Sequence, residues 1–272
     1  MNAPSAPPRT ASVRTVKPAR ILSWLQAGWR DAVAIGPLSW GHGLAIAAFG
    51  AVVLWFAHQQ FLLLAGAFSG FLVVAPLVAT SFYAMSRSRE LGAPVNVHML
   101  LSVWTGWQRA RISEPGSYWC MVRFGLLLML AGTGWVVTSA SMLSLASGQA
   151  VHNPMDFVQH VLLAKQGWLF ESWVVFGAML AAPVFASSVV SMPYMLDRKV
   201  CIRQAINRSW EVVLENPLTM ALWAVTLAGL TVLGMLPAML GLVVVMPVLG
   251  HASWHAYRDL LDTSGEVARE LL

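Results

Sequence analysis

The chain is 272 residues long, 57% hydrophobic and only 11% charged. Soluble domains carry about 25% charged residues, so this composition excludes an ordinary water-soluble protein and indicates a membrane protein. The formal net charge of +5 does not indicate nucleic acid as a partner, because the basic residues stand in short blocks between apolar runs. The two cysteines, Cys120 and Cys201, fall in segments expected on the cytoplasmic side, where no disulfide is expected.

Residues 1–19 contain no apolar run and are rich in Pro, Ser, Ala and basic residues. Because the hydrophobic core of a signal peptide is missing, we expect a disordered cytoplasmic tail there. Residues 20–260 are expected to form the membrane domain, and residues 261–272 are expected to form a cytoplasmic C-terminal tail.

Six apolar stretches approach the length of about 20 residues that a helix needs to cross a bilayer. They are arranged as three pairs, with a short connection in the first pair and almost none in the third. The expected spans are Leu38–Ala57, Phe61–Met85, Met121–Ala146, Trp168–Leu196, Leu218–Leu236 and Pro237–Tyr257. A sharp turn is expected over Met235–Met239, because the last two spans are short and Pro237 lacks a backbone donor.

The seventeen Lys and Arg residues set the expected orientation. All of them except Lys165 stand on one side of the expected spans, in the N-terminal segment, in 86–123, in 197–216 or in the C-terminal segment. The positive-inside rule therefore predicts that both termini are cytoplasmic, with the chain in a bacterial inner membrane.

A threefold internal repeat is predicted from the spacing of tryptophans and prolines. Each pair of spans follows a Trp, a Pro seven or eight residues later, and a further Trp. The three copies contain Trp29, Pro37 and Trp40; Trp107, Pro115 and Trp119; and Trp210, Pro217 and Trp223. A proline also interrupts the second span of each copy, at Pro76, Pro183 and Pro247. An aromatic residue and an arginine follow two of these prolines at equal offsets, as Tyr83 and Arg87 and as Trp254 and Arg258.

The segment before each pair of spans has apolar residues at helical spacing, flanked by arginines. The shared faces are Ile21, Trp24, Leu25, Gly28 and Ala32; Leu100, Trp104, Trp107 and Arg111; and Ile202, Ile206, Ser209, Trp210 and Val213. Such helices lie in the headgroup layer, with Trp rings at the acyl boundary and Arg toward phosphate. Packing against the cytoplasmic ends of the spans is an alternative that is compatible with the first.

His251 and His255 stand one helical turn apart in the last expected span, so their rings can project from one face. Neutral imidazole is a common ligand of metals and haem iron, which makes this pair the candidate cofactor-binding site. No third ligand is specified nearby. The alternative is a pair of polar rings at the membrane boundary, beside Trp254, Tyr257 and Arg258.

Other candidate chemistry is weaker. His152, Asp156 and His160 have helical spacing in the outer loop, where the solvated face of a surface helix is preferred over a weak cation site. The expected spans hold no charged residue at membrane depth, which counts against a proton relay. Their Ser and Thr residues are expected to pack helices together. Hydrolase, P-loop and zincin motifs are absent, so an enzyme is not expected.

Four stretches resemble the bacterial family called domain of unknown function 2189, whose members are predicted integral membrane proteins. They are 36–44 (GPLSWGHGL), 70–92 (GFLVVAPLVATSFYAMSRSRELG), 205–223 (AINRSWEVVLENPLTMALW) and 247–260 (PVLGHASWHAYRDL). The resemblance covers residues 14–262 and implies an inner-membrane protein with no established activity. Some members carry a cytochrome c oxidase label. Haem-copper oxidases need histidines deep in several spans, which this sequence lacks, so a catalytic oxidase subunit is not expected.

The sequence therefore predicts an all-α membrane protein with six transmembrane helices in three hairpin repeats, each preceded by an amphipathic interfacial helix on the cytoplasmic side. The expected function is a non-enzymatic scaffold, lipid-interacting or assembly protein, with lipids, a second copy or a respiratory complex as partners. A passive or facilitated transporter is the first alternative, since prolines interrupt three spans. A haem- or metal-binding subunit using His251 and His255 is the second, and the sequence specifies no cofactor.

Overall fold

The computed structural model describes residues 11–57, 67, 71, 75, 76, 78–111, 114, 116–146 and 168–270. These residues form helices, connecting segments and one short sheet, so the expected all-α class is confirmed. The elements are β1 (Ser12–Val13), α1 (Arg20–Ile35), α2 (Pro37–Ala57), α4 (Thr80–Glu90), α5 (Val97–Arg109), α6 (Tyr118–Ala146), α8 (Trp168–Ser188), α9 (Ser191–Asp197), α10 (Ile202–Glu215), α11 (Pro217–Met235), α12 (Leu242–Leu260) and β2 (Leu261–Asp262).

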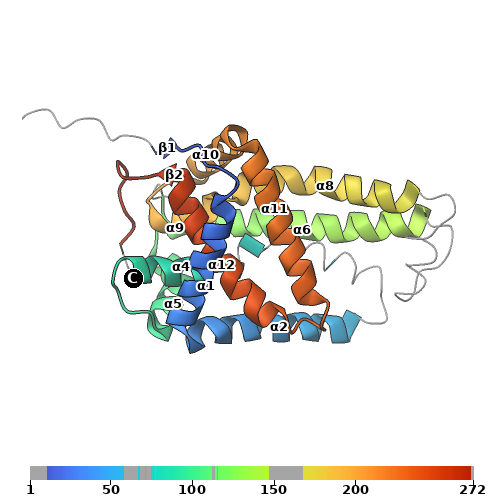
Figure 1. The fold of residues 1–272 in the computed structure, drawn as a ribbon, viewed down its shortest axis with the longest axis horizontal. Helices are drawn as coiled ribbons and strands as arrows, with labels where there is room; N and C mark the ends of the chain where they lie inside the picture. Colours follow the sequence, from blue (N-terminus) through green and yellow to red (C-terminus); the bar gives the residue numbers. More distant parts are fainter. Residues whose placement is uncertain are drawn as a thin grey trace, which may run out of the picture.

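Four helical stretches are long and apolar enough to cross a membrane, judged by length and composition. They are Pro37–Trp55, Tyr118–Leu145, Trp168–Asp197 and Pro217–Met235. Figure 1 shows α2, α6 and α8 extending to the right from a block of shorter helices, with α6 and α8 packed side by side, whereas α11 runs steeply downward beside α12. Each of the four carries large exposed apolar side chains, for example Phe49, Leu130, Met179 and Val225. The architecture is that of an integral membrane protein with several apolar helices.

The other two expected spans are not confirmed. Phe61–Met85 lies mostly outside the described residues, and α4 begins near its end. The expected span Pro237–Tyr257 corresponds to α12, which is not among the four because its second half carries histidines and a charged pair. The sharp turn before α12 is confirmed, since Ala238 and Met239 have positive φ angles of 49° and 70°.

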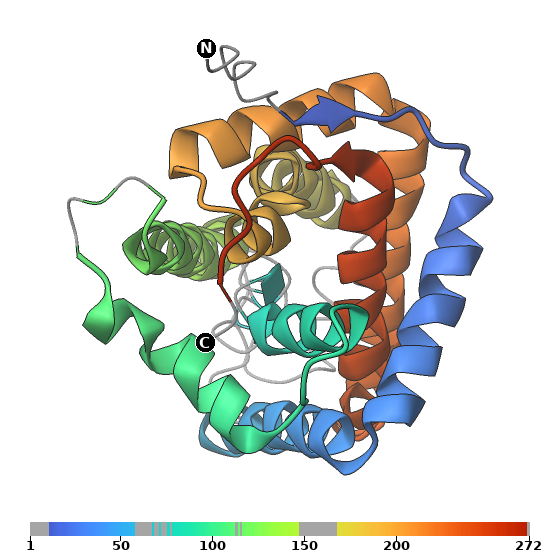
Figure 2. The same cartoon turned by 90° about the vertical axis from the view of Figure 1, so that its left-hand side faces the viewer.

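Three amphipathic helices, α1, α5 and α10, lie around the outside of the short-helix block. Figure 2 looks onto this end and shows them around α4, α9 and α12. α1 packs along α12, α5 packs against α4, and α10 packs against α8 and α9. We call α1, α5 and α10 the rim helices. Their inner faces therefore pack on the other helices, as the second of the two interpretations of these segments predicted.

Helix ends follow from local chemistry. Gly36 ends α1 with a φ of 69°, which favours glycine, and its backbone N–H donates to Ala32 O. Pro37 then begins α2. The Asn96 side chain accepts from Met99 N at 2.8 Å and caps the first turn of α5.

The two ends of the chain meet, because β1 pairs antiparallel with β2. The backbone N–H of Val16 also donates to the side chain of Asn216 at 2.7 Å. Residues 11–19 are therefore fixed against the domain, which corrects the expected disordered tail over 1–19; the ten residues before them lie outside the described part of the chain. Residues 261–270 are likewise held against the helices, by contacts described below.

The rim helix α1 approaches the α12 backbone closely at Gly28. A Cβ atom added there would lie 2.4 Å from Val248 O and 2.7 Å from Ala252 N of α12. Trp24 and Ala32, on the same face of α1, are buried. Because backbone atoms fill this space, Gly28 sets the separation of the first and last described helices.

We expect the substitution Gly28→Ala to lower the stability of the protein, because its methyl group would push α1 away from the α12 backbone. Overpacking of this kind costs about 1–3 kcal/mol, which corresponds to a loss of several degrees in Tm. Thermal unfolding in mild detergent measures it. The control is Gly41→Ala on α2, where an added Cβ meets nothing within 4 Å. Equal Tm values for the two variants would contradict the packing described here.

Candidate functional site

The predicted histidine pair lies on α12, facing the rim and the neighbouring helices. His251 is fully buried. Its Nε2 lies 2.9 Å from Ser39 Oγ on α2, and its Nδ1 lies 2.7 Å from Ser86 Oγ on α4. The ring also packs edge-on against Phe82, with centroids 5.4 Å apart. Both ring nitrogens of His251 therefore have a serine partner.

Asp31 on α1 joins the two histidines. Ser86 Oγ donates to Asp31 Oδ2 at 2.6 Å, and His255 Nε2 lies 2.9 Å from the same oxygen. Arg89 donates to Asp31 Oδ1 at 2.7 Å. We call Asp31, Ser39, Ser86, Arg89, His251 and His255 the histidine cluster. It connects α1, α2 and α4, which follow one another among the described helices, with α12 near the other end of the chain.

The hydrogen positions in this cluster follow from the donor count. Ser86 has one hydroxyl hydrogen, which goes to Asp31, so it accepts from His251 Nδ1. With Nδ1 protonated, a neutral His251 ring presents its Nε2 lone pair to the Ser39 hydroxyl. The hydrogen bonds then run in one direction: Ser39 donates to His251, His251 donates to Ser86, and Ser86 donates to Asp31.

The electrostatic centre of the cluster is the Asp31 carboxylate, which is 6% exposed. Burial alone raises its pKa, but the hydrogen bonds from His255 and Ser86 outweigh burial, and the pKa of Asp31 lies below its ordinary value. Asp31 is therefore ionised at neutral pH, and Arg89 compensates its charge.

Ser39, His251, Ser86 and Asp31 form a hydrogen-bonded series that resembles a catalytic arrangement, but their burial does not suit catalysis. Ser39 and His251 are both fully buried, so a substrate does not reach the Ser39 hydroxyl in this conformation. Metal binding by His251 requires one of its two serine bonds to be given up. Among the described residues, no group of three or more His, Cys, Asp or Glu is placed to hold a metal ion. The cofactor interpretation of His251 and His255 stays a prediction.

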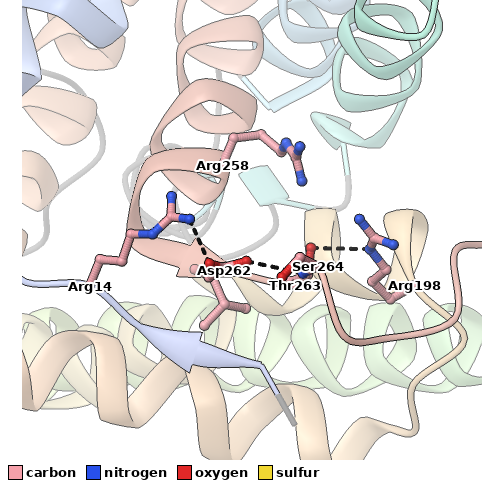
Figure 3. Close-up of a pocket in the computed structure, with 7 residues that line it drawn as sticks. Arg14, Arg198, Arg258, Asp262, Thr263 and Ser264 are labelled. Atoms are coloured by element: carbon pink, nitrogen blue, oxygen red, sulfur yellow. Dashed lines mark hydrogen bonds and ion pairs between the residues drawn. The ribbon is translucent and has the colours of Figure 1, made fainter. Parts of the chain in front are cut away.

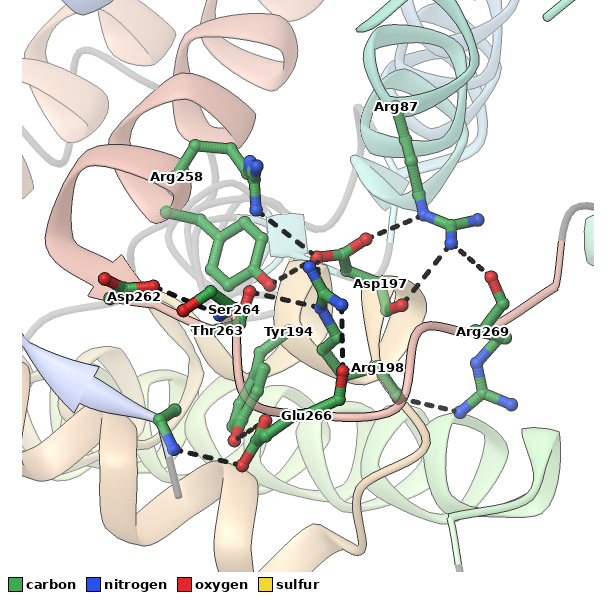
Figure 4. Close-up of polar contacts among 12 residues, drawn as sticks. Arg87, Tyr194, Asp197, Arg198, Arg258, Asp262, Thr263, Ser264, Glu266 and Arg269 are labelled. Atoms are coloured by element: carbon green, nitrogen blue, oxygen red, sulfur yellow. Dashed lines mark hydrogen bonds and ion pairs between the residues drawn. The ribbon is translucent and has the colours of Figure 1, made fainter. Parts of the chain in front are cut away.

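A second polar cluster centres on Asp197 at the end of α9. Its carboxylate meets Arg87 Nε of α4 at 2.9 Å, Arg198 Nε at 3.0 Å, Arg258 Nη1 of α12 at 3.6 Å and the Tyr257 hydroxyl of α12 at 2.8 Å. Figure 4 shows the side chains of Arg87, Arg198 and Arg258 around Asp197. We call Arg87, Asp197, Arg198, Tyr257 and Arg258 the arginine cluster.

The C-terminal segment completes this region. Arg269 is 5% exposed, and its Nε donates to Met195 O at 3.0 Å while its Nη2 donates to Gly116 O at 2.7 Å. Its guanidinium also lies 4.5 Å from the centre of the Tyr118 ring. Arg87 donates to the backbone carbonyl of Arg269, as Figure 4 shows. Burial lowers the pKa of Arg269. The C-terminal segment is therefore packed against the domain through the contacts of Arg269.

Several serines that the sequence assigned to packing accept hydrogen bonds from indoles. Trp104 on α5 donates to Ser81 at 2.9 Å, and Trp210 on α10 donates to Ser187 at 3.0 Å. These bonds tie two rim helices to α4 and α8. The outer-loop set of His152, Asp156 and His160 lies outside the described residues.

Sequence reasoning found His251, His255, Arg87 and Arg258 but missed their partners. One signal was available: Asp31 shares the apolar face of α1 with Trp24 and Gly28. A carboxylate on a face that is otherwise apolar needs a buried partner. Nothing comparable marks Ser39 or Ser86, since serine is common in such a chain.

A family model described as predicted integral membrane protein (DUF2189) matches residues 62–197, which is half of the chain. No curated protein and no solved structure matches it.

We expect Asp31→Asn to destabilise the protein by about 2 kcal/mol, because the amide loses the charge-assisted hydrogen bonds that the carboxylate accepts from Ser86, His255 and Arg89. Glu215→Gln, an exposed substitution on α10, is the control and is expected to have little effect. Thermal unfolding in detergent compares the two.

The same variant has a predicted pH dependence. Because folding lowers the pKa of Asp31, its contribution is present above the ordinary pKa near 4 and is lost as pH falls through the lower folded value. The stability gap between wild type and Asp31→Asn should therefore shrink below about pH 4. A gap that stays constant from pH 7 to pH 3 would show that the Asp31 charge is not the source.

Proposed function

We propose that this chain, which belongs to the domain of unknown function 2189 family of predicted integral membrane proteins, is a non-enzymatic scaffold of the bacterial inner membrane that organises lipid around its cytoplasmic end. Partner proteins, such as a second copy or a respiratory complex, dock on the same lipid-facing helices. The buried, internally satisfied state of both polar clusters supports a structural rather than a catalytic role.

The observation that carries the proposal is that the rim helices have exposed tryptophan side chains. Trp29, Trp104, Trp107 and Trp210 are 38% to 49% exposed, although large aromatic side chains bury well in proteins. Exposed arginines stand next to them, including Arg30, Arg109 and Arg203. An indole at the acyl boundary with a guanidinium toward phosphate is the pattern of a helix lying in the headgroup layer.

A second aromatic level supports the same membrane position. Trp55 at the far end of α2 and Trp168 at the far end of α8 are 74% and 66% exposed. The 19 residues of Pro37–Trp55 rise about 28 Å, which matches the hydrocarbon thickness of a bilayer. The rim and these two residues therefore suit the two interfaces of one membrane.

We further propose six spans with both termini in the cytoplasm. The pairing of β1 with β2 supports this, because it requires the two ends of the chain to be on one side and so an even number of crossings. The four apolar helices, one crossing that ends in α4 and one that ends in α12 give that number. The basic residues, of which all but Lys165 belong to the side with the termini, give the direction.

We also propose the threefold repeat, because equivalent segments of the three copies pack in equivalent ways. Each rim helix packs on the last helix of the preceding copy, α5 on α4 and α10 on α9, and α1 closes the circle on α12. Edge-on tryptophan pairs recur in the first two copies, Trp29 with Trp40 at 5.9 Å and Trp107 with Trp119 at 5.4 Å. The third copy departs, because Trp223 packs against Trp24 at 5.5 Å.

Lipid contact of the rim is tested by tryptophan fluorescence in bilayers whose lipids carry bromine near the headgroup. In a Trp55→Phe, Trp168→Phe background, which removes the exposed indoles of the opposite interface, replacing Trp29, Trp104, Trp107 and Trp210 by Phe should remove most of the quenching by these lipids. The control is Trp135→Phe, which removes an indole that is 7% exposed. Shallow quenching that persists in the fourfold variant would contradict the proposed rim placement.

Topology is tested by labelling a single thiol. With Cys120 and Cys201 replaced by Ala, we expect Lys165→Cys to react with a membrane-impermeant reagent from the periplasm in intact cells. Cys201, which is exposed in the structure, serves as the matched control when it is the one thiol retained, and should react after permeabilisation only. The opposite pattern overturns the orientation.

A further inference from the structure

Beyond the proposed scaffold role, a cavity of about 170 Å³ opens where the two ends of the chain meet. Its lining includes Arg14, Arg198, Arg258, Asp262, Thr263 and Ser264. Figure 3 shows the three guanidinium groups to the left of, above and to the right of the turn formed by Asp262 to Ser264. The lining thus comes from the segment after β1, the segment after α9, the end of α12 and the turn after β2.

Positive charge dominates this lining. It has three arginines, and Asp262 is the one carboxylate among the lining residues. Asp197 is shared by Arg87, Arg198 and Arg258, and Glu90 pairs with Arg258 at 2.9 Å, so two carboxylates serve these three guanidiniums. Positive charge is therefore in excess where the cavity opens.

The donors suit an oxyanion. Guanidinium groups match the oxygens of phosphate in geometry and charge, and hydroxyl groups such as those of Thr263 and Ser264 can add hydrogen bonds. The volume is below the 300 Å³ or so at which pockets for larger organic ligands begin. The cavity therefore suits a tetrahedral anion, or a phosphate group at the end of a larger molecule that extends into solvent.

The Asp262 carboxylate affects how well the cavity can bind a phosphate group. Its Oδ2 lies 2.8 Å from Nη2 of Arg14, and its Oδ1 accepts from Ser264 N at 3.1 Å. The Ser264 N–H and the Arg14 guanidinium lower the pKa of Asp262 to about 2, so the group is charged at neutral pH. The Asp262 carboxylate thus pairs with the guanidinium of Arg14, which is the most exposed of the three arginines and would otherwise be free to bind an anion.

We propose that this cavity is a phosphate-binding site in which Arg14, Arg198 and Arg258 hold the anion and Asp262 competes with it for Arg14. The phosphate group comes either from a soluble molecule or from a lipid headgroup, and the chemistry of recognition is the same. The site lies at the end of the molecule away from the projecting ends of the long helices, as the positions of β1 and β2 in Figure 1 show.

The test is titration of the full-length protein in detergent with inorganic phosphate at constant ionic strength, with chloride as the reference anion. Arg14→Gln should weaken phosphate binding about tenfold, because it removes one charge-assisted bond. Asp262→Asn should strengthen binding several-fold, because it removes the competitor while its amide oxygen still accepts from Ser264 N. The two variants therefore move affinity in opposite directions.

The matched control is Arg20→Gln. Arg20 pairs with Asp259 at 2.7 Å, and its side chain is 52% exposed, against 50% for Arg14, but it does not line the cavity. Its substitution should leave phosphate affinity unchanged. Equal effects of Arg14→Gln and Arg20→Gln, or weaker binding by Asp262→Asn, overturn the site. Asp262→Asn keeps the proposal testable even if Arg14→Gln proves unstable.

A second arm identifies the source of the phosphate group. The wild type is titrated with phosphate in nanodiscs of phosphatidylcholine and of phosphatidylglycerol. Competition by phosphatidylglycerol that is weaker in Arg14→Gln nanodiscs and stronger in Asp262→Asn nanodiscs assigns the site to a headgroup. Equal affinity in both bilayers assigns it to a soluble anion. No phosphate binding by wild type or Asp262→Asn in either medium overturns the proposal.

Discussion

The Asp197 carboxylate is the interaction on which the arrangement of the helices depends. It is 6% exposed and receives side chains from α4 and α12 as well as its own neighbour Arg198. Between membrane helices the hydrophobic effect supplies little driving force, so shape and polar contacts decide how they associate. A carboxylate with four donors fixes three helix ends at one point. The C-terminal segment then covers that point through Arg269.

This constraint explains why the molecule has two unlike ends. Polar residues gather where α4, α9 and α12 meet, and the rim helices enclose them. The long apolar helices leave this end and present exposed leucine, valine, phenylalanine and methionine side chains. A protein built in this way has a rigid end that holds its shape and an apolar part whose surface is offered to lipid or to other helices. This arrangement is the structural basis of the scaffold role proposed above.

Sequence reasoning succeeded where short-range physics decides the structure. Apolar length predicted six spans, and four of them are helices long and apolar enough to cross a membrane. Proline and a short loop predicted the turn before α12, and helical spacing predicted the three rim helices. It failed where partners are far apart in the chain. His255 and Asp31 are separated by 224 positions, so nothing near either of them specifies the other. The tail was missed for the same reason, since β1 has no partner until β2 is present.

The contact of α1 with α12 has a consequence for how the protein is made. The ribosome delivers α1 long before α12, and the atoms nearest to a Cβ added at Gly28 belong to α12. Until α12 is present, the face of α1 that contains Asp31, which is buried in the folded protein, has no helix to pack against. The bilayer surface is a suitable resting place for an amphipathic helix during that interval. The contact between α1 and α12 therefore forms after α12 has been synthesised, whatever the order in which the other helices pack.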